Sequence, residues 1–173
     1  MGKLIYGTQT GTTDEIAEKI QKAIPDLIDE VKPVFRASPE DFQGSDFFIL
    51  GGSTWGDGEL TDDWQDFYPQ LDQIDFSGKT VALFGLGDQY GYGYHFVSAM
   101  KILYDKVKEK GARVIACEVS TDGFDYEHSE SVEDNQFIGL VLDEVNQPEM
   151  TDERIESWCE QVKAEAPAAV SQS

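Results

Sequence analysis

The chain has 173 residues, 40% of them hydrophobic and 12% aromatic, which suits one domain with a substantial core and excludes general disorder. Acidic residues number 34 and basic residues 13, for a formal net charge of -21, so a basic protein surface is an expected partner whereas nucleic acid and anionic membranes are not. No apolar run approaches the length of a membrane span.

Predicted strands and helices alternate along the chain. A short apolar strand at residues 4–6 leads into an amphipathic helix that starts near Asp14. A weaker strand over residues 31–35 contains a proline, which indicates a sheet edge. The runs at residues 47–50 and 81–84 are continuously apolar, as in parallel strands that are covered on both faces.

A fifth strand is expected in two pieces, at residues 114–116 and 137–142. An acidic and aromatic insertion at residues 120–136 separates the two pieces. The last helix follows, with Thr151 as its expected N-cap.

This alternation predicts an α/β fold with a three-layer, doubly wound, five-stranded parallel sheet in the order 2-1-3-4-5. We assign it to residues 1–166 and expect residues 167–173 to be a flexible C-terminal tail. In this strand order a crevice opens at the carboxyl ends of strands 1 and 3. The loops that begin at Thr8, Gly51 and Gly85 are therefore expected to meet there.

The first of these loops has four hydroxyl side chains and a glycine at a strand-to-helix turn, in the sequence TQTGTT at residues 8–13. Free backbone N–H groups and the positive end of a helix dipole favour an anion at such a turn. The segment has no Lys or Arg and matches neither the Walker pattern nor the dinucleotide fingerprint, so it suits one compact phosphate. A Thr-rich helix cap without a ligand is the alternative, and the segment alone favours neither.

Aromatic residues occupy the other two loops. Trp55 lies among small residues after the third strand, and Tyr90, Tyr92 and Tyr94 alternate with glycines after the fourth. Aromatic side chains at adjacent strand ends can hold a planar heterocycle whose phosphate lies in the first loop. A tryptophan packed on a helix and ordinary surface tyrosines are the alternatives, but the three loops together favour a flavin or nucleotide site.

The cysteines and histidines do not predict a metal site. Cys117 in a strand and Cys159 on a helix face are expected to be buried, reduced thiols. His95 and His128 have no partner at metal-ligand spacing. Because the first strand begins at once, no signal peptide is expected, and the protein is expected to be cytoplasmic.

Four segments resemble, in the same order, those of the bacterial long-chain flavodoxins. They are residues 6–13, 54–60, 85–92 and 139–144. The resemblance extends from the first strand to the last helix, and the split fifth strand is what marks the long-chain subgroup. It implies an electron carrier, not an enzyme, with a tightly but noncovalently bound FMN.

The resemblance also implies roles for individual residues. Residues 8–13 would hold the 5′-phosphate, Trp55 would cover the inner face of the isoalloxazine and Tyr92 the outer face. Asp88 would meet its pyrimidine edge, and the peptide after Gly56 would turn its carbonyl toward flavin N5 on reduction. The implied cofactor-binding residues are Thr8, Gln9, Thr10, Gly11, Thr12, Thr13, Ser53, Thr54, Trp55, Gly56, Asp57, Gly58, Gly87, Asp88 and Tyr92.

Because acidic groups oppose a second negative charge on the ring, such a carrier is expected to have a low potential and to shuttle mainly between semiquinone and hydroquinone. Its expected partners are basic-surfaced redox proteins, a reductase donor and a low-potential acceptor, and it is expected to be a monomer. One alternative is a flavin-dependent quinone reductase, although no nicotinamide site is recognised. A receiver domain would need acidic residues where Thr8 and Ser53 stand, and a cofactor-free binding module would leave the aromatic loops unexplained.

Overall fold

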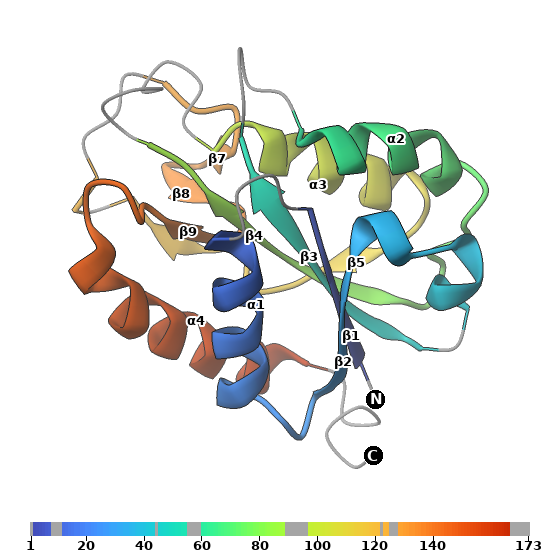
Figure 1. Ribbon diagram of the computed structural model, residues 1–173, viewed down its shortest axis with the longest axis horizontal. Helices are drawn as coiled ribbons and strands as arrows, with labels where there is room; N and C mark the ends of the chain where they lie inside the picture. The colour runs from blue at the N-terminus through green and yellow to red at the C-terminus, as the bar shows by residue number, and fades with distance from the viewer. Residues whose placement is uncertain are drawn as a thin grey trace.

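The central sheet of the computed structural model is parallel and has the predicted order. The structure describes residues 2–7, 12–43, 45–54, 60–88, 97–121, 123–124 and 128–166, so the predicted tail lies outside the described residues. The strand order is β2-β1-β3-β4-β5, and β9 also pairs with β4 (Figure 1). The strands are β1 (Gly2–Tyr6), β2 (Ile28–Pro33), β3 (Phe47–Ser53), β4 (Thr80–Leu86), β5 (Arg113–Val114) and β9 (Leu140–Leu142). The predicted doubly wound fold is thus confirmed, with β2 at the edge.

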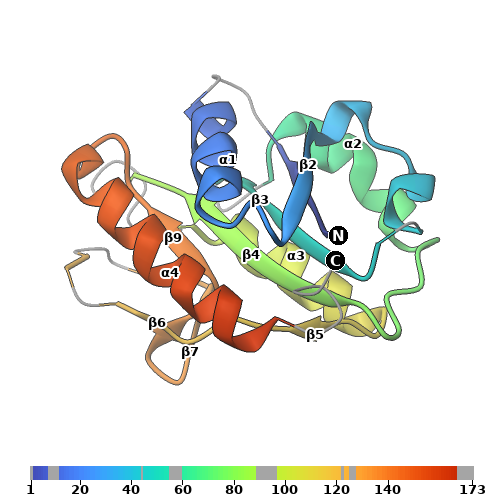
Figure 2. The same ribbon diagram turned by 90° about the horizontal axis from the view of Figure 1, so that it is seen from below.

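Helices cover both faces of this sheet (Figure 1 and Figure 2). One face packs against α1 (Thr12–Ala23) and α4 (Thr151–Glu165), and the other against α2 (Asp62–Leu71) and α3 (Ala99–Glu109). Successive residues of β3 alternate between the two cores: Phe47 lies in the core of α1 and α4, and Phe48 in that of α2 and α3. Because both faces are buried, the strand sequences are continuously apolar.

The fifth strand is split, as predicted, but its pieces are shorter. β5 pairs with the beginning of β4 and β9 with its end, where Leu86 lies opposite Leu142. The first piece ends at Val114 rather than at Ala116, because Ala116 has a left-handed backbone with a φ of 51°. Helix α4 holds Ala116 in this conformation: the Ala116 N–H donates to the Glu165 carboxylate, and the Ala116 carbonyl accepts the indole N–H of Trp158.

The insertion forms a small antiparallel sheet of its own, in the order β6-β8-β7. Its strands are β6 (Val119–Ser120), β7 (Val132–Glu133) and β8 (Gln136–Phe137). Phe137, predicted in strand 5, belongs to β8; its ring is buried and packs edge-on against Phe124, with the ring centroids 5.3 Å apart. The insertion is therefore wider than the predicted residues 120–136, because Phe137 pairs within the small sheet and packs into the core of α2 and α3.

Four local predictions need correction. The second strand, β2, covers Ile28–Pro33 rather than residues 31–35, because a 3-10 helix begins at Val34. Helix α1 begins at Thr12 rather than near Asp14. Thr151 is the first residue of α4 and not its N-cap, because its hydroxyl donates to the Glu144 carboxylate at 2.7 Å. Cys117 is half-buried between β5 and β6 rather than within a strand. Cys159 is buried on α4 as predicted, and burial raises the pKa of its thiol to about 12.

Gly139 tests how closely the second piece of strand 5 approaches β4. A Cβ at this residue would overlap the Leu83 carbonyl oxygen and lie 2.9 Å from the Met100 sulfur. We expect Gly139→Ala to lower the free energy of unfolding of the apoprotein by about 1–3 kcal/mol, because a ladder carbonyl cannot move aside. The measurement is urea denaturation followed by circular dichroism.

The matched control is Gly85→Ala within β4. The nearest atom to a Cβ there is 3.4 Å away, which is ordinary van der Waals contact. Its loss should stay below about 1 kcal/mol. Equal unfolding midpoints for the two variants would contradict the close approach at Gly139.

Candidate functional site at the carboxyl edge of the sheet

The carboxyl ends of four parallel strands align along one edge of the sheet. Backbone N–H groups extend the hydrogen-bond ladders by one residue beyond β1, β3 and β4: Gly7 donates to Gly51 at 2.9 Å, Thr54 to Leu86 at 3.1 Å and Gly87 to Leu142 at 3.0 Å. The chain segments that follow β1, β3, β4 and β9 therefore leave the sheet side by side. This is the edge at which doubly wound sheets bind ligands.

Hydroxyl groups gather where β3 ends and α1 begins. Thr13, in the first turn of α1, is 1% exposed, and its Oγ1 lies 3.4 Å from the Oγ of Ser53. The start of α1 also presents backbone N–H groups and the positive end of its dipole. Lys19, further along α1, is paired with Asp152 at 3.0 Å. Hydroxyl and backbone N–H donors at a helix start can bind one phosphate group without a lysine or arginine side chain.

Trp64 of α2 forms the floor beneath the ends of β1 and β3. Its indole is fully buried and donates to the Gly51 carbonyl at 2.9 Å. A Cβ at Gly7 would overlap the Trp64 ring and the Thr61 hydroxyl, so only glycine fits where the chain leaves β1. Trp64 was not among the predicted site residues. Its signal was the pairing of a tryptophan with glycines at two strand ends.

The segment after β3 is tied to the start of α3. Thr54 is 8% exposed, and its Oγ1 accepts the backbone N–H of Ala99, the first residue of α3, at 3.1 Å. The hydroxyl thus satisfies one of the N–H groups that every helix leaves free at its start. Thr54 therefore supports the edge as well as lining it.

An amide side chain connects the ends of β4 and β9. The Nδ2 of Asn146 donates to Asp88 at 2.7 Å and to Asp143 at 2.9 Å. Asp143 is fully buried, and its Oδ1 also accepts the backbone N–H groups of Val145 and Asn146. Asn146 thereby orients the Asp88 carboxylate. The sequence signal for this turn was an aspartate three residues before an asparagine, in the sequence DEVN.

The structure brings the described part of the predicted site together. Thr13, Ser53, Thr54, Gly87 and Asp88 lie at the carboxyl edge, where Thr12 begins α1. The remaining predicted site residues lie outside the described residues: Thr8, Gln9, Thr10, Gly11, Trp55, Gly56, Asp57, Gly58 and Tyr92.

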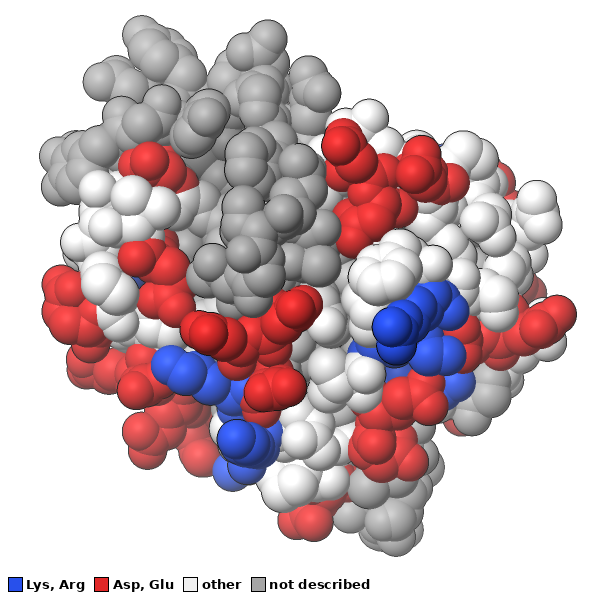
Figure 3. Space-filling view, viewed as in Figure 1, with Lys and Arg blue, Asp and Glu red and all other residues white. Residues whose placement is uncertain are grey.

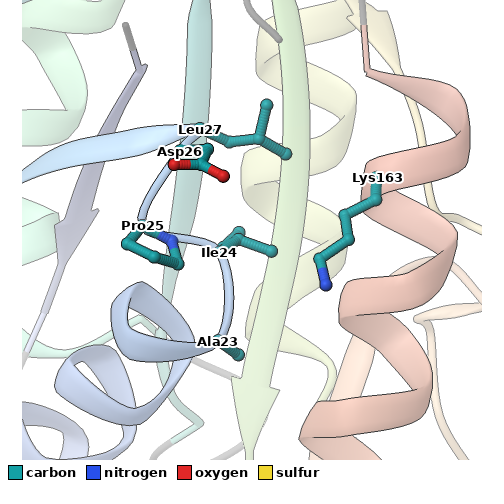
Figure 4. A pocket seen from close by; sticks show the side chains of 6 residues that line it. All are labelled: Ala23, Ile24, Pro25, Asp26, Leu27 and Lys163. Carbon is teal, nitrogen blue, oxygen red and sulfur yellow. The ribbon is translucent and has the colours of Figure 1, made fainter.

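A cavity of about 350 Å³ lies at the opposite edge, beside the turn between α1 and β2. Figure 4 shows Lys163 of α4 extending toward this turn. The lining residues are Ala23, Ile24, Pro25, Asp26, Leu27 and Lys163. Because they are mostly apolar and include no hydroxyl, this cavity does not suit the predicted phosphate.

Charge on the described surface is mainly negative. In the view of Figure 3, acidic side chains surround small groups of basic ones. Lys32, for example, lies 2.8 Å from Asp41, and this hydrogen bond raises the pKa of the Lys32 amine. In the described ranges, no group of three or more His, Cys, Asp or Glu side chains could hold a metal ion. None of the helices found there is long and apolar enough to cross a membrane.

The chain belongs to the flavodoxin family. The family model described as flavodoxin matches residues 4–158. The chain is 45% identical over 161 residues to a flavodoxin of Synechocystis sp., covering 92% of this chain and 94% of the relative. It is 46% identical over 164 residues to a flavodoxin of Trichodesmium erythraeum, with coverage of 94% and 95%.

Solved structures agree with this assignment. The crystal structure of Fusobacterium nucleatum flavodoxin bound to flavin mononucleotide superposes with a TM-score of 0.88 at 36% identity, covering 95% of this chain and 97% of that one. A mutant of the same flavodoxin, also bound to flavin mononucleotide, has a TM-score of 0.88 at 37% identity, with coverage of 95% for both chains. Family membership confirms the predicted fold and the expectation of an electron carrier rather than an enzyme.

Asn146 provides a test of the link between Asp88 and Asp143. Replacement by Ala removes both side-chain donors and leaves the buried Asp143 with fewer partners, so we expect the free energy of unfolding to fall by about 1–3 kcal/mol. The measurement is urea denaturation of the apoprotein at neutral pH. Val145→Ala is the matched control, because Val145 is 69% exposed and interacts with Asp143 only through its backbone. A loss as large for Val145→Ala would contradict the role of the Asn146 amide.

Proposed function

We propose that this chain carries electrons between redox proteins on a noncovalently bound FMN at the carboxyl edge of the sheet. FMN supplies a ring that accepts and returns electrons one at a time, and the protein sets the energy of each step. Membership of the flavodoxin family supports this proposal, as do the similar solved structures, which are of flavodoxins bound to flavin mononucleotide. The observation that carries it is the pair of hydroxyls, Thr13 and Ser53, at the start of α1.

Residues 8–13 would hold the phosphate. The described end of this segment supports the assignment, because the Thr13 hydroxyl is buried and lies at the positive end of a helix dipole. The neighbouring Ser53 hydroxyl offers a second donor from β3. A phosphate held in this way needs no lysine or arginine, since several N–H and hydroxyl donors share its charge.

The ring would lie between the segments that follow β3 and β4. Trp55 and Tyr92 would cover its two faces, and the peptide after Gly56 would face its N5 atom. Asp88 would meet the pyrimidine edge, in the orientation that the Asn146 amide gives its carboxylate. Thr54, Gly58 and Gly87 would supply backbone around the ring, with Thr54 held by α3.

Reconstitution with FMN tests the proposal and the phosphate assignment together. The purified chain should bind one FMN per molecule, measured by quenching of flavin fluorescence, and binding of less than one equivalent would contradict the proposal. Thr13→Val keeps the shape of the side chain and removes its hydroxyl. We expect it to weaken FMN binding about 10- to 150-fold, because a hydrogen bond to a charged group contributes about 1.5–3 kcal/mol.

Riboflavin, which lacks the phosphate, should bind equally well to wild type and Thr13→Val. Thr80→Val is the matched control, because Thr80 is also buried but lies at the amino end of β4. Its affinity for FMN should equal that of wild type. If Thr13→Val weakens riboflavin as much as FMN, the hydroxyl does not serve the phosphate.

The acidic surface should lower the potential of the second one-electron step. Each carboxylate about 10–15 Å from the ring opposes an added negative charge by about 0.3–0.8 kcal/mol at an effective dielectric constant of about 40–80. Asp62 and Asp63 begin α2, directly after the segment that contains Trp55. Changing both to Asn should raise this potential by about 25–70 mV at low ionic strength, measured by spectroelectrochemical titration.

Two acidic residues at the opposite edge serve as the control. Asp26 and Asp29 flank the start of β2, so their replacement by Asn removes the same charge far from the ring site. Their effect should be less than half as large. Equal shifts for the two pairs would mean that net charge, rather than position, sets the potential.

The same reasoning extends to partners and setting. A net charge of -21 favours a reductase donor and a low-potential acceptor with basic docking surfaces. We assign the chain to the cytoplasm as a monomer of one domain over residues 1–166, with residues 167–173 as a tail. Its two free cysteines, Cys117 and Cys159, suit a reducing compartment.

A further inference from the structure

Val97, just before α3, has an unusual backbone conformation. Its φ is 48°, in the left-handed region, and its side chain is fully buried. A β-branched residue rarely adopts this conformation, which persists only where surrounding contacts hold it. In the sequence, Val97 directly follows residues 89–96, the segment that contains Tyr92.

Ser131 of the insertion holds this strained residue. Its hydroxyl donates to the Val97 carbonyl at 2.7 Å and accepts the backbone N–H of Lys101 at 3.1 Å. Ser131 is fully buried, so water cannot replace either bond. One side chain from the insertion therefore restrains Val97 and offers the Lys101 N–H a second acceptor beside the Ser98 carbonyl, which lies 3.1 Å away.

Further bonds fix Ser131 itself. The Ser129 hydroxyl accepts the backbone N–H of Ser131 at 3.1 Å, and the Ser131 carbonyl accepts the N–H of Ile138 at 3.0 Å. A parallel contact joins the same two segments, because the Ser98 hydroxyl accepts the N–H of Glu130 at 3.0 Å. The insertion is thus hydrogen-bonded to two consecutive residues before α3, Val97 and Ser98.

The start of α3 is also hydrogen-bonded to the carboxyl edge of the sheet. Ala99, two residues after Val97, donates its N–H to Thr54 at the end of β3. The contacts of Ser131 and Thr54 therefore meet on one turn of α3. A shift of this turn would therefore move both Thr54, at the end of β3, and Val97, which directly follows residues 89–96 in the sequence.

We propose that Ser131 is a positioning residue for the flavin site, which holds Val97 in its left-handed conformation and so couples the insertion to cofactor affinity. This inference rests on the proposed function. Without the Ser131 hydroxyl, Val97 of the apoprotein relaxes to a negative φ, and flavin binding has to restore the strained conformation. The energy of that strain is then lost from the affinity.

The test compares four proteins by fluorescence titration with FMN and with riboflavin: wild type, Ser131→Ala, Val97→Gly and the double variant. Ser131→Ala should weaken the binding of both flavins by the same factor, about 5- to 150-fold, since it leaves the phosphate contacts intact. Glycine adopts a positive φ without strain. Adding Ser131→Ala to Val97→Gly should therefore change the affinity by less than about 3-fold.

Tyr104→Phe is the control for a general loosening of the insertion. It removes the hydrogen bond from the Tyr104 hydroxyl to Glu133 at 3.0 Å, another contact between α3 and the insertion, without touching Val97. Its flavin affinities should equal those of wild type. Melting temperatures of the four apoproteins and of this control confirm that each is folded at the titration temperature.

Three outcomes would overturn the inference while leaving the proposed function intact. The first is unchanged flavin affinity in Ser131→Ala. The second is a loss of flavin affinity in Tyr104→Phe as large as that in Ser131→Ala. The third is that adding Ser131→Ala to Val97→Gly lowers the affinity as much as Ser131→Ala does in wild type. Failure of the wild-type chain to bind FMN would overturn the proposed function itself. The two failures are therefore distinguishable.

Discussion

The candidate site depends on the pairing of β3 with β4. The two strands are in parallel register over seven residue pairs, from Phe47 opposite Thr80 to Ser53 opposite Leu86. This register places Thr54 and Gly87 at the same height on the carboxyl edge. A slip of one residue would turn every β3 side chain to the wrong core, so burial on both faces fixes the register strongly.

The floor of the edge is built by close packing rather than by charge. Trp64 of α2 packs beneath β1 and β3. The hydrogen bond from its indole to the Gly51 carbonyl attaches α2 to the sheet. Glycine at residue 7 lets the chain pass directly over the ring. Residues at the start of α2 are thereby held in place relative to the Thr13 hydroxyl at the start of α1, although the two helices lie on opposite faces of the sheet.

Features that depend on local sequence were predictable. The buried strands follow from the continuous apolar runs, and the place of the site follows from the strand order. Several features that were mispredicted or missed depend on contacts outside the local segment. Ala116 leaves the sheet because Trp158 and Glu165 bind its backbone, and the Thr151 hydroxyl turns to Glu144 instead of capping its own helix. Asn146 acts through two carboxylates, one of them 58 positions away in the sequence.

The start of α3 explains why the insertion belongs to the fold and is not an appendage. A helix with a conventional N-cap satisfies its first N–H groups from its own sequence. Ser98, at the cap position of α3, has helical dihedral angles and makes no side-chain cap bond. Thr54 instead accepts the N–H of Ala99 from 45 positions earlier in the sequence. Ser131, 30 positions after Lys101, adds a second acceptor to the Lys101 N–H, which the Ser98 carbonyl also accepts. The first turn of α3 is therefore complete only when both β3 and the insertion are in place, which makes the insertion part of the same cooperative unit as the carboxyl edge.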